Sequence, residues 1–422
     1  MKNQQLFIEQ AKSILVKNDV DGYTIPTHGL YPFQWNWDAA ITALGWMKVD
    51  ESRAWLEVEM LLKGQWDNGM VPHIVFHKPV DTYFPGPDVW GVKNKIPTTA
   101  ISQPPVLVTV VKMMFEQAQD KALAEVQLAE MLPKLIAYHK WWYNDRDPEN
   151  TGLVVSYHPW ESGMDNSPAW DESLAAVPPV DYSYKRKDLD HVDSDERPHA
   201  EQYDRYIYLV DFFKNCNFDS ALIYKNCPYK TNDLGIISIL HKATKDLVSL
   251  CEQSKNNEQN IAWFNEQLAL TENNINTLWS DEHNSFLNKD VITQKLSPVL
   301  TTGTMLVIFA ELASAKQMKV LTPLLNDWLN ETPYAMSSTY AKCEAFEPQR
   351  YWRGPVWLHI NWMIALGADS YGLTKESEQL KQASATLIDE FGFFEYFNSK
   401  TGAGCGGDDF SWTAAIALHW LL

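Results

Sequence analysis

The chain has 422 residues, of which 45% are hydrophobic, and it carries a formal net charge of −19. The hydrophobic fraction is sufficient for a large core. The negative charge argues against a nucleic acid or an anionic membrane as partner, because both select for basic surfaces. No run of about 18 apolar residues occurs, so we expect no membrane span.

Apolar residues recur at helical spacing along the whole chain. This spacing predicts helices near residues 4–17, 37–48, 51–63, 105–118, 121–144, 204–214, 232–252, 259–279, 302–313, 315–329, 355–371, 374–390 and 410–421. Strand patterns are few and short, at 73–76 and 153–157. No low-complexity linker divides the series. We therefore predict an all-α fold with one domain over residues 1–422.

Two connections, at about 65–104 and 146–203, are much longer than ordinary connecting loops. Loops of more than about 15 residues in a compact domain are usually functional or disordered. Disordered linkers contain few aromatic residues, whereas these loops carry Trp66, Trp90, Trp160 and Trp170. We expect both loops to be ordered and to cover a ligand site.

The second loop contains the stretch HPWESGMDNSPAWD, residues 158–171. Asp165 lies between Gly163 and Pro168, so a turn would hold a short acidic side chain at a fixed place. A purely structural Asx turn is the alternative at this position.

A second acid, Glu395, is flanked by aromatic residues in the stretch FFEYFNSKTG. Apolar surroundings raise the pKa of a carboxyl group, which suits an acid or a base in catalysis. The alternative is a buried structural glutamate. Two acids on separate loops with many Trp nearby are what hydrolysis of a glycosidic bond requires.

Two further stretches combine Trp with charged residues. In YPFQWNWD, residues 31–38, Asp38 falls in the first turn of a predicted helix, where it could simply cap that helix. In EPQRYWRGPVW, residues 347–357, we expect Pro355 to open a helix. There Arg353 could pair with a structural carboxylate, and Trp357 could pack on the first turn.

Other chemistries have weaker support in the sequence. His73 and His77 have a spacing seen in zinc sites, but they fall on a predicted strand, so we expect no metal. Neither a G-x-S-x-G motif nor a phosphate-binding glycine loop occurs, and we expect no cofactor. Five cysteines without a pattern, and an N-terminal stretch that does not read as a signal peptide, favour a cytoplasmic location.

Seven motifs in order, over residues 30–415, resemble glycoside hydrolase family 63. They are QWNWDAA, GQWDNGMVPHIVFH, YFPGPDVWG, SQPPV, WESGMDNSPAWD, YWRGPVW and EYFNSKTG with FSWTAA. The likeness is closest to the short mannosylglycerate and glucosylglycerate hydrolases. It implies an (α/α)6 barrel that cleaves a small α-glucoside or α-mannoside with inversion.

The resemblance also implies roles for individual residues. Asp165 would be the general acid and Glu395 the general base. The sugar-binding positions would be Tyr31, Trp35, Asp38, Gln103, Trp160, Gly163, Trp352 and Trp357. Tyr83, Arg197 and Tyr203 would contact the aglycone, since the planar guanidinium of arginine suits a carboxylate. Glu161, Trp170 and Asp171 would support the site.

One departure concerns the aglycone. Asp409, after Asp408, stands where the glycerate hydrolases tend to carry Gln, and a negative charge there would repel glycerate. The sequence therefore leaves open a neutral α-glucoside as substrate, such as an α-linked disaccharide or a glucosylated polyol. A non-catalytic sugar-binding protein and a sugar epimerase are remoter alternatives. Glucose versus mannose and the oligomeric state, a homo-oligomer included, also stay open.

Overall fold

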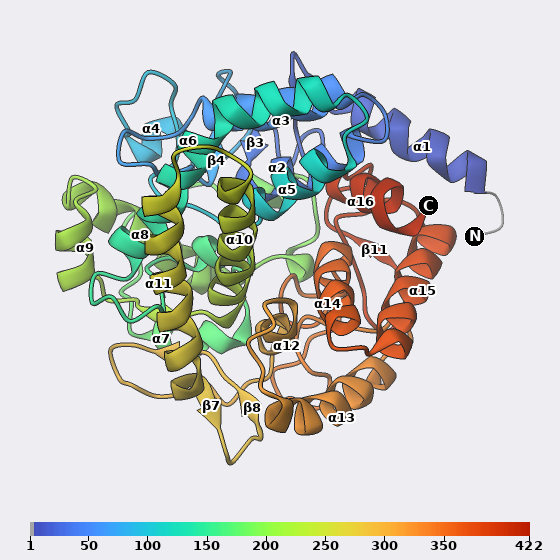
Figure 1. Ribbon diagram of the computed structural model, residues 1–422. Coiled ribbons are helices and arrows are strands. Elements are labelled where there is room, and N and C mark those ends of the chain that lie inside the picture. Colours follow the sequence, from blue (N-terminus) through green and yellow to red (C-terminus); the bar gives the residue numbers. More distant parts are fainter. Residues whose placement is uncertain (1–3) are drawn as a thin grey trace.

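The computed structural model describes residues 4–422. Within this range six helices form a closed inner ring, because each packs against the next and the last packs against the first. They are α2 (Asn36–Trp46), α5 (Leu107–Gln117), α10 (Leu234–Glu252), α12 (Thr302–Phe309), α14 (Leu358–Ser370) and α16 (Ser411–Ile416). Figure 1 shows these helices around the centre of the molecule, with the sequence colours passing once round from blue to red.

An outer helix precedes each inner helix in the chain. These outer helices are α1 (Gln4–Lys17), α3 (Glu51–Leu62), α6 (Lys121–Arg146), α11 (Glu258–Asn274), α13 (Ala315–Glu331) and α15 (Thr374–Phe391). Most of them pack on an inner neighbour, and α13 packs on α15. The alternation is an (α/α)6 toroid, which confirms the predicted fold class.

Inner and outer helices differ in how many of their residues are buried and apolar. Every residue of α2 and α12 is buried, and most of them are apolar. The outer helices bury one face only. Several helices begin at a capping side chain, such as Asp50, Asp120 and Asp233, which accept hydrogen bonds from backbone amides of the first turn.

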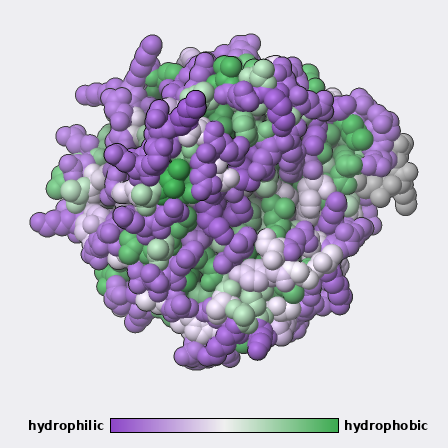
Figure 2. Space-filling model, viewed as in Figure 1, coloured by the Kyte–Doolittle hydropathy of each residue, from purple (hydrophilic) through white to green (hydrophobic). Residues whose placement is uncertain are grey.

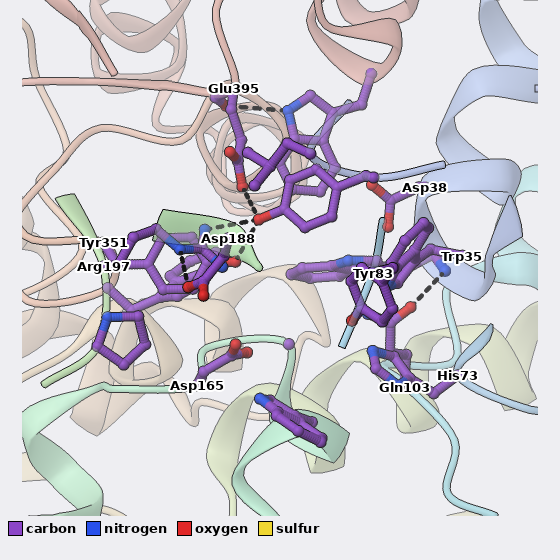
Figure 3. A pocket seen from close by; sticks show the side chains of 18 of the residues that line it. Trp35, Asp38, His73, Tyr83, Gln103, Asp165, Asp188, Arg197, Tyr351 and Glu395 are labelled. Carbon is purple, nitrogen blue, oxygen red and sulfur yellow. Dashed lines mark hydrogen bonds and ion pairs between the residues drawn. The ribbon is translucent and has the colours of Figure 1, made fainter. Parts of the chain in front are cut away.

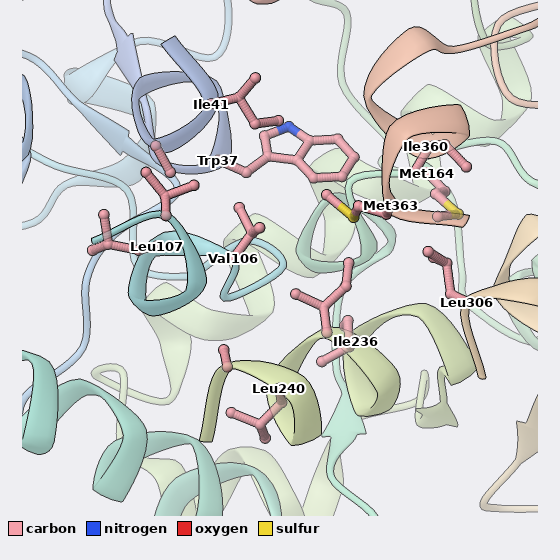
Figure 4. Close-up of a cluster of buried hydrophobic side chains, with 14 of the residues drawn as sticks. Trp37, Ile41, Val106, Leu107, Met164, Ile236, Leu240, Leu306, Ile360 and Met363 are labelled. Atoms are coloured by element: carbon pink, nitrogen blue, oxygen red, sulfur yellow. The ribbon is translucent and has the colours of Figure 1, made fainter. Parts of the chain in front are cut away.

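The hydrophobic core fills the middle of the ring. Figure 4 shows side chains from α2, α5, α10, α12 and α14 converging on one cluster. Met164 joins this cluster from the loop that carries Asp165. The core therefore anchors a loop of the candidate site from beneath.

All predicted helices are present, with ends displaced by a few residues. The helix predicted at 204–214 is α8 (Ala200–Asn215), which lies outside the ring. The prediction that Pro355 opens a helix is wrong: α14 begins at Leu358, because Val356 forms bridges with Ser337 and Phe397 in extended conformation. Three short helices in the connections were not predicted, namely α4 (Pro87–Trp90), α7 (Asp171–Ala175) and α9 (Ser220–Asn226).

The strands have two residues each and join the connections to one another. All pairings are antiparallel: β1 (Asp19–Val20) with β2 (Tyr23–Thr24), β3 (Gln34–Trp35) with β4 (Ile74–Val75), β5 (Val155–Ser156) with β6 (Thr231–Asn232) and β6 with β9 (Lys289–Asp290), β7 (Trp279–Ser280) with β8 (Ser285–Phe286), and β10 (Tyr396–Phe397) with β11 (Gly404–Cys405). The two predicted strands correspond to β4 and β5. β5 leads toward Asp165, and β10 directly follows Glu395.

The surface is predominantly polar. Figure 2 shows hydrophilic residues over most of the visible face, with hydrophobic residues dispersed among them. None of the helices in residues 4–422 combines the length and the hydropathy needed to cross a membrane.

Candidate active site

One cavity brings together the residues that the motifs singled out. Of the thirteen predicted site residues, twelve line it, and Trp357 is the exception. The two long loops contribute Tyr83 and Trp160 to its wall, so both loops are ordered parts of the site, as expected. Figure 3 shows Asp165 and Glu395 facing this space from opposite sides.

Glu395 is buried and firmly held. The Tyr31 hydroxyl donates a hydrogen bond of 2.9 Å to Oε1, and the backbone amide of Gly407 donates one of 3.2 Å to Oε2. The indole Nε1 of Trp412 donates to the Glu395 carbonyl oxygen. Burial raises the pKa of Glu395 to about 7, although the Arg197 charge and these hydrogen bonds act in the opposite direction.

A glycine hairpin makes this arrangement sterically possible. Gly406 has φ +69°, and a Cβ atom there would lie 2.2 Å from Oε2 of Glu395. Only glycine combines this backbone conformation with so close an approach. Gly406 therefore lets the chain pack directly against the carboxyl group of Glu395.

Asp165 occupies the turn that its sequence predicts. The helical turn η1 (Pro159–Ser162) ends at Gly163, which has φ +65°. A Cβ atom added to Gly163 would lie 2.7 Å from the Trp37 ring. On the next residue, the carbonyl oxygen of Met164 accepts a hydrogen bond of 2.9 Å from Trp170 Nε1. Burial raises the pKa of Asp165 to about 7, with the Arg197 charge opposing it.

The two carboxyl groups differ in their hydrogen bonds. Glu395 accepts from Tyr31 and Gly407, which favours its ionised form. Among residues 4–422, no side chain donates a hydrogen bond to the Asp165 carboxyl group. The surroundings therefore favour a proton on Asp165 and a free carboxylate on Glu395.

The neighbouring acids of the same stretch have supporting contacts. Glu161 is fully buried and forms an ion pair of 2.7 Å with Arg146 at the end of α6. Asp171 binds both terminal nitrogens of Arg353, each at 2.9 Å. The alternative expected for Arg353, pairing with a structural carboxylate, is thus confirmed.

Arg197 reaches the cavity from the second long loop. Its Nε lies 3.1 Å from Asp188 Oδ2, and the same oxygen lies 2.6 Å from Arg186 Nη2. Its Nη1 donates a hydrogen bond of 2.7 Å to the Tyr31 hydroxyl, and its guanidinium lies over the Tyr351 ring. Two guanidinium groups thus share one carboxylate, which leaves this cluster one net positive charge.

Tyr83 and Tyr203 bring the two long loops into contact. The Tyr203 hydroxyl donates a hydrogen bond of 3.0 Å to the carbonyl oxygen of Phe84. The Tyr83 ring meets the rings of Trp35 and Phe33 edge to face. Both tyrosines line the cavity, as Arg197 does.

Aromatic rings make up much of the remaining wall. Trp352 lines the cavity, and Trp357 stacks on its far side, with the ring centroids 3.8 Å apart and the planes 2° from parallel. Trp357 therefore supports the wall rather than forming its surface, which differs from the role that the resemblance gave it. Trp160 also lines the cavity and packs against His73.

Asp38 and Gln103 complete the predicted polar groups. Asp38 lies in the first turn of α2, and burial, with the nearby Glu395 charge, raises its pKa well above the usual range. Gln103 uses its Oε1 to accept from the backbone amide of Trp37. Both keep polar groups in an otherwise aromatic wall.

Several lining residues were not predicted. They include Trp37, His73, Asp188, Tyr351 and Trp412. Four of them, all except Asp188, lie inside the motifs QWNWDAA, GQWDNGMVPHIVFH, YWRGPVW and FSWTAA, so the motifs carried a signal that single positions did not. Asp188 lies among other acids on a long loop, and nothing in the sequence distinguished it.

The two histidines of the zinc-like spacing have different surroundings. His73 lines the cavity, and burial lowers its pKa to about 3. His77 instead lies with Nε2 2.8 Å from the side-chain oxygen of Gln34. In the part of the chain that the structure describes, no group of His, Cys, Asp and Glu side chains could hold a metal ion.

Asp409 does not line the cavity. Its carboxylate forms an ion pair of 2.6 Å with Lys17 at the end of α1. It borders a separate surface hollow together with Asp408. The predicted repulsion of an anionic aglycone by Asp409 therefore has no support in its position, because the side chain points away and is paired.

A toroid of alternating helices with two facing carboxyl groups and an aromatic wall has the arrangement of a glycoside hydrolase. The comparisons agree: the family described as "Mannosylglycerate hydrolase MGH1-like glycoside hydrolase domain" matches residues 31–413, and the chain belongs to it. This confirms the resemblance to glycoside hydrolase family 63.

Named relatives cover nearly the whole chain. Mannosylglycerate hydrolase MGH1 of Selaginella moellendorffii is 44% identical, over 100% of this chain and 86% of the relative. Glucosylglycerate hydrolase of Mycolicibacterium hassiacum is 30% identical, over 98% and 97%. The crystal structure of a mannosylglycerate hydrolase of this glycoside hydrolase family from Thermus thermophilus, in complex with Tris and D-glycerate, superposes with a TM-score of 0.95 at 41% identity, over 99% of this chain and 100% of that one.

Proposed function

We propose that the protein hydrolyses the α-glycosidic bond of mannosylglycerate or glucosylglycerate with inversion, as one catalytic domain. The observation that carries the choice of aglycone is the Arg186–Asp188–Arg197 cluster, whose net positive charge borders the cavity. A carboxylate is the ligand that such a guanidinium prefers. The names of the relatives agree with this choice.

The reaction follows from the two acids. Protonated Asp165 donates its proton to the glycosidic oxygen as the bond from that oxygen to C1 breaks. Glu395 takes a proton from a water molecule, whose oxygen forms the new bond to C1 from the opposite face. The products are a β-sugar and glycerate. The proton held by Glu395 then returns to solvent and Asp165 is reprotonated.

The other roles are assigned to residues that line the cavity. Tyr31, Trp35, Asp38, Gln103, Trp160, Gly163 and Trp352 would surround the sugar, and Tyr83, Arg197 and Tyr203 the glycerate. Trp357 would act only through Trp352.

The test follows the anomer of the released sugar by NMR during hydrolysis of mannosylglycerate and glucosylglycerate. We expect the β-anomer to appear first. Asp165→Asn and Glu395→Gln should each lower kcat by about 100-fold or more, the range expected for losing a general acid or base. An initial α-anomer, or wild-type turnover in either variant, would exclude the proposed mechanism.

The aglycone is tested with matched neutral glycosides, mannosylglycerol and glucosylglycerol, which replace the carboxylate by a hydroxymethyl group. A hydrogen bond to a charged group contributes about 1.5–3 kcal/mol, so kcat/KM should fall about 10- to 150-fold. Equal or better hydrolysis of the glycerol compounds would favour the alternative, a neutral α-glycoside.

A further inference from the structure

Residues 186–199 form a segment, called the strap below, that covers one side of the cavity. It contributes Asp188, Arg197 and Pro198 to the wall. Under the proposed function its arginine holds the aglycone. Two consecutive strap residues, Glu196 and Arg197, also reach the immediate surroundings of Glu395, from different directions.

The first connection runs through a tyrosine. Arg197 Nη1 donates a hydrogen bond of 2.7 Å to the Tyr31 hydroxyl, which in turn donates one of 2.9 Å to Glu395 Oε1. Burial raises the pKa of Tyr31 well above its usual value, so the phenol keeps the proton that it donates. A cation that donates to the phenol oxygen polarises the hydroxyl and strengthens its hydrogen bond to the carboxylate.

The second connection runs through the glycine hairpin. The backbone amide of Gly406 donates a hydrogen bond of 2.9 Å to Glu196 Oε2. The next amide, of Gly407, donates to Glu395 Oε2. The Tyr396 hydroxyl also donates, at 2.6 Å, to the Glu196 carbonyl oxygen. The strap therefore fixes the same short hairpin that holds the catalytic carboxyl group.

Each oxygen of Glu395 is thus tied to the strap, Oε1 through Tyr31 and Oε2 through the Gly406–Gly407 hairpin. Figure 3 shows Glu395 and Arg197 at the cavity. We propose that Glu196 and Arg197 are positioning residues for the general base, so that the segment binding the aglycone also prepares the base. The inference rests on the proposed function for the role of Glu395 as base, and its link to the aglycone rests on the proposed aglycone site.

The positive charge of Arg197 is important for the protonation state of Glu395. The ionisable groups that interact with this carboxyl are Tyr31, Asp38, Asp165, Arg197, Tyr351, Tyr396 and Cys405. Arg197 is the one cation in this set, and the others are acids or neutral donors. Loss of the Arg197 charge or of the Tyr31 hydrogen bond should therefore shift the base toward its protonated form.

The test uses α-mannosyl fluoride and α-glucosyl fluoride as substrates. Fluoride leaves without protonation and lacks the glycerate group, so turnover reports on the base and not on the aglycone site. For Glu196→Ala and for Tyr31→Phe we expect kcat on the fluoride to fall about 10- to 100-fold, since general base catalysis contributes 100-fold or more. For Tyr31→Phe the acidic limb of the pH profile should also move to higher pH by about one unit, because the lost hydrogen bond favoured the ionised carboxylate.

The controls use the same segment. Asp195→Asn changes the neighbouring strap residue, whose side chain is 80% exposed and makes one ion pair of 3.5 Å with Arg350, and should leave the fluoride profile unchanged. Glu196→Gln keeps an oxygen that can accept from Gly406 and should restore most of kcat. If Glu196→Ala fails to fold, Tyr31→Phe still tests the inference through the position of the acidic limb.

The outcomes separate this inference from the proposed function. Wild-type kcat and pH profile on the fluoride in Glu196→Ala and Tyr31→Phe, with only KM for the glycerate glycoside raised, would overturn it. Wild-type protein that cleaves a fluoride but no glycerate glycoside would refute the proposed aglycone and leave the strap test valid. Protein inert toward both fluorides would overturn the base assignment and this inference with it.

Discussion

At the scale of single residues, two buried carboxyl groups set the pH dependence. Burial raises the pKa of both Asp165 and Glu395 to about 7. The base must be ionised and the acid protonated, so kcat/KM should fall below about pH 7 through protonation of Glu395 and above it through ionisation of Asp165. We expect a narrow bell-shaped profile with its maximum near neutrality, measured between pH 5 and 9.

Because the two groups lie in one cavity, the limbs belong to the pair rather than to either residue alone. A glycosyl fluoride needs no general acid, and the alkaline limb should disappear with it. A profile that is flat over this range with the glycerate glycoside would contradict the assignment of both carboxyl groups.

At the scale of elements, the end of α6 supports the turn that presents the acid. Glu161 of η1 and Arg146 of α6 form a buried ion pair, and the Tyr157 amide also donates to Glu161. Removing one partner of a buried pair costs about 3–5 kcal/mol, because the other charge stays buried and unpaired. Glu161→Gln should lower the free energy of unfolding, measured by urea denaturation, by roughly this amount and reduce kcat.

The matched control is Glu116→Gln, which removes the (i, i+4) ion pair with Lys112 on the surface of α5. Surface pairs contribute about 0–1 kcal/mol. Equal losses of stability in the two variants would show that the pair beneath the Asp165 turn has no special role.

At the scale of the molecule, the ring closes where α16 packs on α2, some 370 residues away in sequence. At this seam a Cβ added to Gly45 would lie 2.6 Å from the Cα of Ala415. Overpacking a core contact costs about 1–3 kcal/mol, so Gly45→Ala should lower Tm clearly. Gly86→Ala, where the nearest atom would lie 3.7 Å away, is the control and should leave Tm unchanged. An unchanged Tm for Gly45→Ala would mean that the seam can relax.

The sequence by itself determined the helices and their order. Apolar spacing is a local property, and an inner helix such as α12 is recognisable because all its residues are apolar or small. Turn chemistry was also local: Gly163, close to Asp165, predicted a tight turn, and it has a positive φ in the structure. Of the thirteen site residues predicted from the sequence, twelve line the cavity.

Only the tertiary structure decided which side chains face one another. In the folded protein Asp409 pairs with Lys17, and Trp357 stacks behind Trp352. Neither contact follows from the neighbouring residues in the sequence. Folding also joins Glu196 to Gly406, which lie 210 residues apart. Contacts of this kind depend on how the helices close into a ring, and closure is set by packing over the whole chain rather than by any one segment.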